Sequence, residues 1–378
     1  MWRFASYCLL PFIPMLHAII MAGGSGSRLW PESRANHPKQ LLKIGADTPL
    51  IRQSVDRIQT LIPPERIYLS TNSRLAQPLL DAVEVLPPES AIVEPAGRNT
   101  AACIALAAVH CLKKDPDATM VILTSDHRIA PESEFQNCVK AAAELVEQDP
   151  TRLITFGIVP RWPSESYGYI HRCSGSGEVV NGVNVYPVKE FKEKPSRDVA
   201  ESFLKDGHYF WNSGMFVWKA QTILDNIAQF EPELGAAFDA IAQAWDSDPE
   251  TRQKVLAQQF AAMKSISIDY AVMERSPNVS VVEASFDWDD IGSWTSLERL
   301  SKQDEQGNTI QCKRYVCVDT EGTIVRCSDP NHLIATVGVR DLAIIETPSA
   351  TLVINKKNEE AVRKAVEQIK ENDWTQWL

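Results

Sequence analysis

The chain has 378 residues, of which 44% are hydrophobic and 23% charged, a balance typical of a soluble globular protein with room for two domains. Its formal net charge of −11 argues against the basic surface that nucleic-acid binding requires. No apolar run reaches the ~20 residues of a membrane span, so neither a nucleic acid nor a membrane is an expected partner.

The cysteines and the N-terminus indicate the cellular compartment. Eight cysteines are scattered without a Cys-x-x-Cys pair or a histidine at zinc spacing, which favours reduced thiols and a cytoplasmic location. Residues 1–16 form an N-terminal extension that faintly resembles a signal peptide. Pro11 and Pro14 interrupt its apolar stretch and no small-residue cleavage site follows, so we expect no export. Met15 is an alternative start.

From residue 17 to about residue 160, apolar runs of strand length alternate with segments of helical periodicity. This alternation predicts a largely parallel sheet covered by helices on both faces. Ligands of such sheets bind beyond the carboxyl ends of the strands, so the residues after each run are the candidates. The predicted strands are His17–Ala22, Arg66–Thr71, Ala91–Glu94, Met120–Thr124 and Leu153–Val159.

The pattern changes twice further along the chain. Residues 167–294 have the character of an insertion that returns to the first domain, with three short strands around a helical region from Ala220 to Met263. After residue 308, five short β-rich runs and a final amphipathic helix, Glu359–Glu371, predict an all-β tail that is a small sandwich or a few β-helix coils. We therefore expect one domain over 17–300 and a second over 301–378. The short strands are Val183–Phe191, Met215–Trp218, Val279–Glu283, Tyr315–Val318, Thr323–Val325, Leu333–Val337, Leu342–Glu346 and Thr351–Ile354.

A glycine-rich loop, Gly23–Arg28, follows the first strand. Glycine adopts positive φ freely, so this loop can turn several N–H groups toward one anion, with Arg28 and Lys39 adding charge. It is not a Walker A loop, and Leu29 stands where a dinucleotide fingerprint has its third glycine. The loop predicts a polyphosphate site of a third kind. An ordinary strand-to-helix turn with two surface cations is the alternative.

Two acidic positions are candidates for metal binding. Asp126 comes two residues after a predicted strand, and Asp290 lies in the later cluster Asp287–Gly292. Magnesium takes one or two protein carboxylates and completes its shell with water and substrate phosphates. Each aspartate alone is equally readable as a helix cap or a turn residue. Together with the phosphate loop they predict a metal–nucleotide site.

Three further loops carry polar side chains suited to a nucleotide sugar. Glu193 and Asn212 at loop tips can bond sugar hydroxyls, and Lys194 can meet a phosphate, although both segments are also ordinary turn sequences. A carboxylate such as Glu94 accepts from both N1–H and the 2-amino group of guanine. The alternative is that Glu94 is solvated while Asn99 or Thr100 caps a helix.

These motifs, in this order, resemble the sugar-phosphate nucleotidylyltransferases, most closely their mannose-1-phosphate guanylyltransferase branch. The matching segments span His17–Trp294, about three quarters of the chain, and are Ala22–Pro31, Pro38–Leu42, Glu94–Thr100, Ser125–His127, Tyr167–Ile170, Phe191–Pro195, Asn212–Phe216 and Phe286–Trp294.

The resemblance implies an α/β fold in which a Rossmann-like nucleotidyltransferase domain with a mixed, mostly parallel sheet is joined to a small β-helix-like domain. It also implies that GTP and α-D-mannose 1-phosphate react, with Mg²⁺, to give GDP-mannose and pyrophosphate. Longer relatives append an isomerase domain, and isomerase activity is not expected here. The tail is expected to mediate a homodimer.

The resemblance assigns a role to each site residue. Arg28 and Lys39 would stabilise charge at the α-phosphorus and the leaving pyrophosphate, and Asp126 and Asp290 would hold Mg²⁺. Nucleotide contacts would come from Gly23, Gly24, Ser25, Gly26, Ser27, Glu94, Asn99 and Thr100, and sugar-phosphate contacts from Gly168, Glu193, Lys194 and Asn212.

Two other functions fit the same motifs. One is a pyrophosphorylase for another sugar 1-phosphate or nucleotide. The other is a catalytically silent subunit that binds a nucleotide sugar and regulates a partner. A silent copy would be expected to lose Arg28, Lys39 or one of the two aspartates, and this chain retains all of them.

Overall fold

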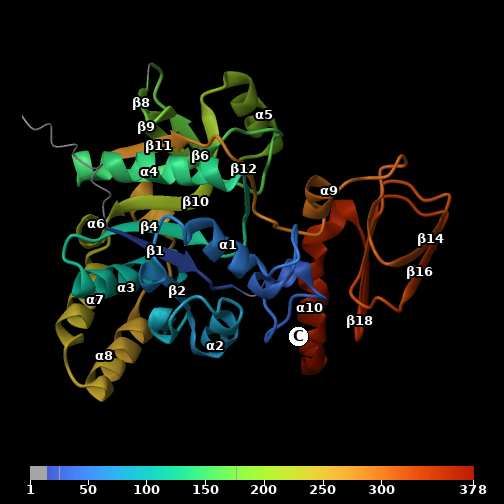
Figure 1. Cartoon of the computed structure of the whole chain (residues 1–378), viewed down its shortest axis with the longest axis horizontal. Helices are drawn as coiled ribbons and strands as arrows, with labels where there is room; N and C mark the ends of the chain where they lie inside the picture. The colour runs from blue at the N-terminus through green and yellow to red at the C-terminus, as the bar shows by residue number, and fades with distance from the viewer. Residues whose placement is uncertain (1–14, 25, 176) are drawn as a thin grey trace, which may run out of the picture. The chain divides into compact units, whose positions relative to one another are not determined.

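The computed structural model describes residues 15–24, 26–175 and 177–378 (Figure 1). The predicted extension over residues 1–14 and the predicted nucleotide contact Ser25 lie outside the described residues. The chain divides into two compact units, each built from distant segments. Of the described residues, unit 1 contains 15–19, 98–122, 137–175 and 177–284, and unit 2 contains 20–24, 26–97, 123–136 and 285–378. The domain boundary predicted at residue 300 stays a prediction.

Unit 1 is organised on a mixed sheet with strand order β1-β4-β10-β6-β11-β9-β7 and with β8 on β9. Two of its strands, β1 (Leu16–Met21) and β4 (Thr119–Thr124), contribute residues to both units. The pairing of β6 with β11 is parallel, whereas β10 pairs antiparallel with β4, β6 and β7. The other strands are β6 (Leu153–Ile158), β7 (Tyr169–Arg172), β8 (Glu178–Val180), β9 (Val183–Lys192), β10 (Tyr209–Lys219) and β11 (Val279–Glu283).

The mixed α/β class is confirmed, and antiparallel pairing takes a larger share of unit 1 than the alternation of strands and helices predicts. The reason is local: β7, β8 and β9 pair as antiparallel neighbours, and β10 returns between β4 and β6. Gly157 lets these strands approach closely, since a Cβ there would lie 2.6 Å from Val281 Cγ2 and 2.7 Å from Phe210 Cβ. The sheet therefore needs glycine at this position.

Helices pack on the unit 1 strands and on one another. The longest apolar helix, α3 (Asn99–Lys114), is buried along most of its length and is rich in alanine, which allows close helix packing. It contacts α6 and α7, and α7 contacts α8. The remaining helices are α4 (Glu132–Gln148), which begins in unit 2, α5 (Arg197–Asp206), α6 (Ala220–Phe230), α7 (Pro232–Ala244) and α8 (Pro249–Ala262).

The first half of unit 2 is a smaller layer of strands in the order β3-β2-β1-β4. Strands β2 (Ile67–Asn72) and β3 (Ala91–Glu94) pair in parallel, and the helices α1 (Leu50–Ile58) and α2 (Ser73–Asp81) lie in the connections. A short antiparallel ribbon joins β5 (Arg128–Ala130) to β12 (Asp287–Asp289). This ribbon brings together the segments that carry the two candidate metal ligands.

The tail of unit 2 is β-helix-like rather than a sandwich. Its strands alternate between two parallel sheets, β13-β15-β17 and β14-β16, which is the pattern of a chain that coils. Strand β18 closes the first sheet in antiparallel pairing with β17. The elements are α9 (Ser296–Leu300), β13 (Thr309–Gln311), β14 (Arg314–Val318), β15 (Ile324–Cys327), β16 (Leu333–Val337), β17 (Leu342–Thr347), β18 (Ala350–Asn355), the 3-10 segment η6 (Lys356–Ala361) and α10 (Val362–Glu371).

One hydrophobic cluster runs through unit 2 from the glycine-rich loop to the tail. Leu29 packs in the same cluster as Trp294, as Ile324 and Ile345 of the coil, and as Val362 of α10. Burying these side chains contributes of the order of 1.5–3 kcal/mol each. The tail and the loop are therefore parts of one packed body.

The cysteines and the helices of the described residues bear on two of the sequence predictions. The seven cysteines among them are free, as expected for reduced thiols. None of the helices in the described ranges is both long enough and apolar enough to cross a bilayer.

Candidate functional site

The glycine-rich loop leaves β1 and enters the 3-10 turn η1 (Ser27–Leu29). Gly24 and Gly26 have φ values of +101° and +60°, where glycine is favoured. A Cβ on Gly26 would lie 2.5 Å from Lys39 Cβ and 2.9 Å from Ser33 Oγ, whereas a Cβ on Gly23 would meet nothing within 4 Å. Gly26 is thus required by packing, and Gly23 faces open space.

Lys39 is the hub of the site. It begins the 3-10 turn η2 (Lys39–Leu41), and although charged it is only 8% exposed. Its Nζ lies 2.8 Å from Asp126 Oδ2 and donates a second hydrogen bond, 2.7 Å long, to the backbone carbonyl of Asp290. The structure therefore brings together the phosphate loop and both predicted metal ligands, which are distant in sequence.

These residues surround a polar cavity of about 350 Å³. Burial opposes ionisation of Asp126, but the charge of Lys39 and its hydrogen bond outweigh it and lower the pKa of the carboxyl. Asp126 is therefore a carboxylate at neutral pH. The lining residues are Gly26, Ser27, Arg28, Leu29, Lys39, Asp126, His127, Asp290, Gly292 and Arg363.

The three neighbouring aspartates have different environments. Asp289 is 5% exposed and bonded to Arg299, and Asp287 is exposed, whereas Asp290 lines the cavity. The residue after it, Ile291, has a φ of +48° and is fully buried. This conformation is rare for a β-branched residue and marks a locally constrained backbone beside the cavity.

His127 belongs to the same cavity, and sequence reasoning gave it no role. Trp288 Nε1 donates to its Nδ1 over 3.0 Å, so in the neutral ring the proton is on Nε2. Burial, with the charges of Lys39 and Arg57, lowers the pKa of His127 despite the nearby carboxylates. His127 therefore presents a neutral N–H donor to the site.

The predicted sugar-phosphate residues cluster in unit 1. Asn212 donates its backbone N–H to the carbonyl of Gly168 over 2.8 Å, and a Cβ on Gly168 would lie 2.8 Å from Glu193 Oε2. Lys194, with a φ of +41°, pairs with Glu193 over 2.8 Å. Gly168, Glu193, Lys194 and Asn212 are thus neighbours, as a shared ligand would require.

The prediction that Asn212 lies at a loop tip is wrong. It is inside the long strand β10, at a shift in register against β6 between Asn212 and Phe216. The Asn-Ser-Gly segment forms a bulge in the strand instead of a turn. Within it, Gly214 has a φ of +68° and donates its N–H to Asn212 Oδ1 over 3.1 Å. The flanking apolar residues continue the strand on both sides of the turn sequence.

Asp269 is a second residue that sequence reasoning missed. Its Oδ1 accepts a 2.8 Å hydrogen bond from Asn212 Nδ2. Burial raises the pKa of Asp269 and the charge of Glu193 adds to the shift, while the Asn212 hydrogen bond partly offsets it. No strand end or glycine turn marks Asp269 in the sequence, so only the fold reveals it.

The predicted base-reading residues fall in different units. Glu94, at the end of β3 in unit 2, accepts a hydrogen bond from Ser70 Oγ over 3.3 Å. Asn99 and Thr100 begin α3 in unit 1. Arg98 precedes the first residue of α3 and makes no side-chain cap hydrogen bond, whereas Asn99 has a φ of +65° and its side chain accepts the N–H of Thr100. Asn99 thus satisfies one N–H group at the start of the helix, as the alternative reading expects.

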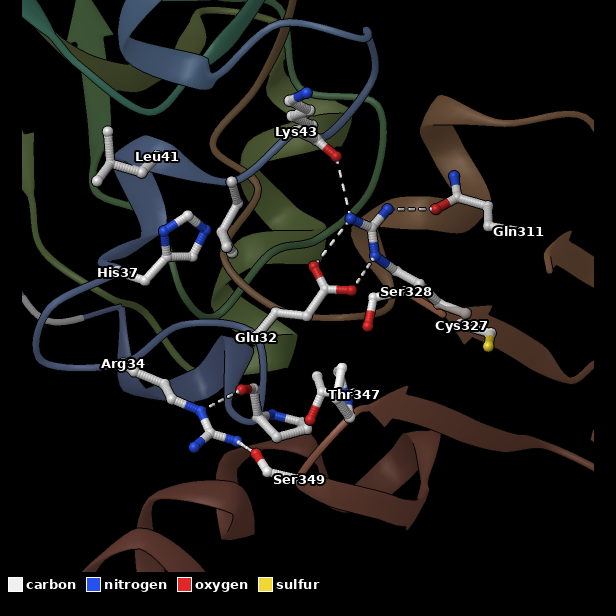
Figure 2. A pocket seen from close by; sticks show the side chains of 14 residues that line it. Glu32, Arg34, His37, Leu41, Lys43, Gln311, Cys327, Ser328, Thr347 and Ser349 are labelled. Carbon is white, nitrogen blue, oxygen red and sulfur yellow. Dashed lines mark hydrogen bonds and ion pairs between the residues drawn. The ribbon is translucent and has the colours of Figure 1, made fainter. Parts of the chain in front are cut away.

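A larger cavity of about 610 Å³ in unit 2 contains none of the predicted site residues (Figure 2). Arg326 lines this cavity and pairs with Glu32 through two contacts of 2.6 and 2.8 Å. The Arg326 guanidinium also donates to the carbonyl of Lys43 over 3.0 Å. Arg34 is held by Ser349 Oγ and the carbonyl of Pro31. Both guanidinium groups of this cavity, Arg34 and Arg326, therefore make contacts within the protein that tie its segments together.

Comparison with known proteins identifies the family of the chain. The nucleotidyl transferase family model matches residues 17–307, and a model described as a mannose-phosphate isomerase/GMP-like β-helix domain matches residues 313–369. A Klebsiella pneumoniae protein named mannose-1-phosphate guanylyltransferase is 36% identical over 365 residues, which cover 96% of this chain and 76% of the relative.

Two solved structures extend the likeness. One, from Thermus thermophilus and described as a mannose-1-phosphate geranyltransferase, has a TM-score of 0.83 and 28% identity, covering 94% of this chain and 99% of its own. A Helicobacter pylori structure described as a mannose-6-phosphate isomerase has a TM-score of 0.56 and 26% identity, covering 73% and 100% of the two chains. With a phosphate loop, a buried lysine and two carboxylates on one cavity, and a family match over most of its length, the chain belongs to the nucleotidyl transferase family.

Proposed function

We propose that this enzyme transfers GMP from GTP to α-D-mannose 1-phosphate, giving GDP-mannose and pyrophosphate. The assembly of Lys39, Asp126 and Asp290 on one polar cavity carries the proposal, in a chain whose relative is named for that activity. A phosphate oxygen of the sugar phosphate forms a bond to the α-phosphorus of GTP. The bond from that phosphorus to the bridging oxygen breaks, and pyrophosphate leaves with the electron pair.

No general base is needed, because the attacking phosphate is already an anion near neutral pH. Catalysis then consists of positioning the two substrates and stabilising charge at the phosphorus. Lys39 is suited to this, since its ammonium is held in place by two hydrogen-bond acceptors. The N–H of His127 Nε2 and the guanidinium of Arg28 provide two more donors at the same cavity.

The donor set around the cavity also fits Mg²⁺. Asp126 and Asp290 offer the hard carboxylate oxygens that this ion prefers. Among the described residues no group of three or more His, Cys, Asp or Glu side chains is arranged to hold a metal, so phosphates and water would complete the shell. When bound, Mg²⁺ supplies neutralisation of the phosphate charge.

Specificity would come from two other places. Glu94 would accept the two N–H groups on one edge of guanine, with Asn99 and Thr100 as further nucleotide contacts. Gly168, Glu193, Lys194 and Asn212 would bind the sugar phosphate, since their mutual contacts in unit 1 form a polar group of the right chemistry. Both substrates are charged metabolites, and we place the reaction in the cytoplasm.

We also propose that the tail forms a homodimer. Alternate residues of β14 and β16 expose apolar side chains on one face, with Val316 51% and Val337 67% exposed. Exposed apolar strips of this kind are typical of protein interfaces. Sedimentation should give a dimer, and Val337→Lys should shift it toward monomer. A wild-type monomer at micromolar concentration would remove the proposal.

A panel assay tests the function. Pyrophosphate release is measured with four nucleoside triphosphates, each combined with mannose, glucose and fucose 1-phosphates. GTP with mannose 1-phosphate should give the highest kcat/KM. A higher value for another pair would identify a different pyrophosphorylase. No release from any pair, combined with binding of GDP-mannose, would identify a silent regulatory subunit.

A further inference from the structure

One wall of the phosphate cavity comes from the C-terminal helix. Arg363 of α10 lines the cavity together with Arg28, Lys39 and the two aspartates. Its neighbour Val362 is 1% exposed and packs in the same hydrophobic cluster as Leu29 of the loop. Figure 1 shows α10 beside the blue segment that contains η1, and the two are in contact. Arg363 is thus held at the phosphate loop by a buried anchor.

The same segment supplies a counter-ion to the loop. Glu360 of η6 pairs with Arg28 through two contacts, Nε to Oε2 at 3.0 Å and Nη2 to Oε1 at 2.9 Å. Arg363 Nη1 lies 3.9 Å from Glu360 Oε2. Glu360 therefore stands between two guanidinium groups at the edge of a cavity suited to polyphosphate.

The charges around the cavity suggest which contacts are replaced when phosphates bind. Lys39 is buried and fixed by Asp126 and Asp290. Arg28 and Glu360 are more open, with side chains 30% and 60% exposed. Solvent therefore screens this guanidinium–carboxylate pair more than the buried contacts of Lys39, although its two-contact geometry is a favourable one. A triphosphate carries several negative charges and matches guanidinium geometry, so it is the stronger partner for Arg28.

We propose that Arg363 is a phosphate-binding residue of the nucleotide site and that Glu360 is a counter-ion from which Arg28 is transferred to the phosphates. This inference rests on the proposed function for the identity of the nucleotide. The proposal gives the β-helix tail a part in substrate binding, because Arg363 of α10 adds a third positive charge to those of Arg28 and Lys39 at the cavity. Glu360 keeps Arg28 oriented in the free enzyme and weakens nucleotide binding by competing for it.

A purely structural role for the Arg28–Glu360 pair predicts the opposite effect. If the pair only ties the tail to the loop, removing the Glu360 charge loosens the loop and weakens binding. If Glu360 competes with phosphate, removing its charge strengthens binding. The sign of one change therefore separates the two roles, without reference to stability.

The experiment measures binding of inorganic tripolyphosphate to the full chain by calorimetry, with Mg²⁺ at low salt. Arg363→Gln should raise Kd about tenfold, the effect of losing one charge-assisted hydrogen bond, and Arg363→Lys should recover part of it. Glu360→Gln should lower Kd several-fold. Lys364→Gln and Glu367→Gln, exposed positions of the same helix, provide controls with identical charge changes.

The inference is overturned if Arg363→Gln changes Kd no more than Lys364→Gln, or if Glu360→Gln weakens binding. Melting temperatures within about two degrees of wild type confirm folded variants. Tripolyphosphate carries neither guanine nor sugar, so this test is independent of the substrate panel. A panel that identifies another nucleotide would leave the roles of Arg363 and Glu360 standing, and a failure of these variants would leave the panel result untouched.

Discussion

Lys39 donates to the Asp126 carboxylate and to the backbone carbonyl of Asp290, so a single ammonium connects two acidic segments that are far apart in the chain. Its burial makes this connection strong, because the two contacts satisfy a charge that would otherwise be costly to remove from water. Lys39 therefore fixes the geometry of the cavity before any ligand binds.

The first prediction concerns Asp126. Asp126→Asn should lower turnover by about 10²-fold or more, because it removes a charge that orients Lys39 and that we propose binds Mg²⁺. Asp287→Asn, at an exposed position of the second cluster, is the control and should have little effect. Turnover is measured as pyrophosphate release at saturating Mg²⁺, with circular dichroism to verify the fold. Equal turnover in Asp126→Asn and wild type would remove the metal assignment.

Two glycines of the loop should respond differently to alanine. Gly26→Ala should reduce the free energy of unfolding by at least about 1 kcal/mol, since the new Cβ would clash with Lys39 Cβ at a positive φ. Gly23→Ala should leave the melting temperature unchanged, because its Cβ meets no atom within 4 Å, but should raise KM for GTP. Thermal melts and initial rates measure both. Equal melting temperatures for the two variants would contradict the loop geometry.

Glu94 is expected to set nucleotide preference. Glu94→Gln keeps the shape of the side chain but replaces one acceptor oxygen with a donor that cannot receive the N–H groups of guanine. The ratio of kcat/KM for GTP to that for UTP should fall about tenfold or more. Ser70→Ala, which removes only the 3.3 Å contact to Glu94, should change the ratio much less. An unaltered ratio in Glu94→Gln would count against base reading.

Asp269→Asn should stabilise the protein at neutral pH. Burial raises the pKa of Asp269 in the folded state, so the wild-type protein loses stability as pH rises from the unfolded pKa through the folded one. Asparagine avoids this cost, and its Oδ1 still accepts from Asn212. The melting temperature should rise by roughly a few degrees at pH 7 and converge with wild type in acid. A drop at pH 7 would show that the carboxylate is stabilised by its surroundings.

His110 should make the protein sensitive to mild acid. Burial, with the nearby charges of Lys114, His17 and Arg252, lowers its pKa to about 4. The unfolded chain takes up a proton near pH 6.5, so stability is complete above that value and falls as pH decreases toward 4. The loss is at most about 3 kcal/mol. His110→Gln should flatten the dependence of melting temperature on pH over this window.

The exposed His332 is the control for that measurement. His332→Gln should retain the wild-type slope between pH 6.5 and 4. If His110→Gln and His332→Gln have the same slope, burial of His110 does not govern acid sensitivity.

Much of the fold could be predicted from the sequence because its strands are short apolar runs with clear ends. Ala91–Glu94, Val279–Glu283 and Leu333–Val337 have the predicted bounds. Most other predicted strands agree to within a few residues, whereas β10 begins at Tyr209, well before the predicted Met215. Helix α4 was not located by residue, although Pro131 before it and Pro150 after it mark its ends and the alternation of strands and helices calls for a helix between β4 and β6.

The candidate site could be predicted only where a short stretch of sequence has a recognisable composition. The glycine-rich loop and the aspartates that follow strands are such stretches, and their residues line one cavity. Asn212 was misplaced because a strand bulge has the composition of a turn. Asp269, Arg363 and Glu360 gain their roles from contacts with residues distant in sequence, and no local pattern records such contacts.

The cluster that joins Leu29 to Val362 has a consequence for synthesis on the ribosome. Leu29 is translated early and packs with Leu42, Ile44 and Leu50 of the same early segment, but its cluster also includes Ile324 and Ile345 of the coil and Val362 of α10. A nascent chain can therefore form only the early part of this cluster until the coil and α10 have been synthesised. The packing around Leu29 is complete only after α10 has been translated, so this part of the cavity wall is the last to form.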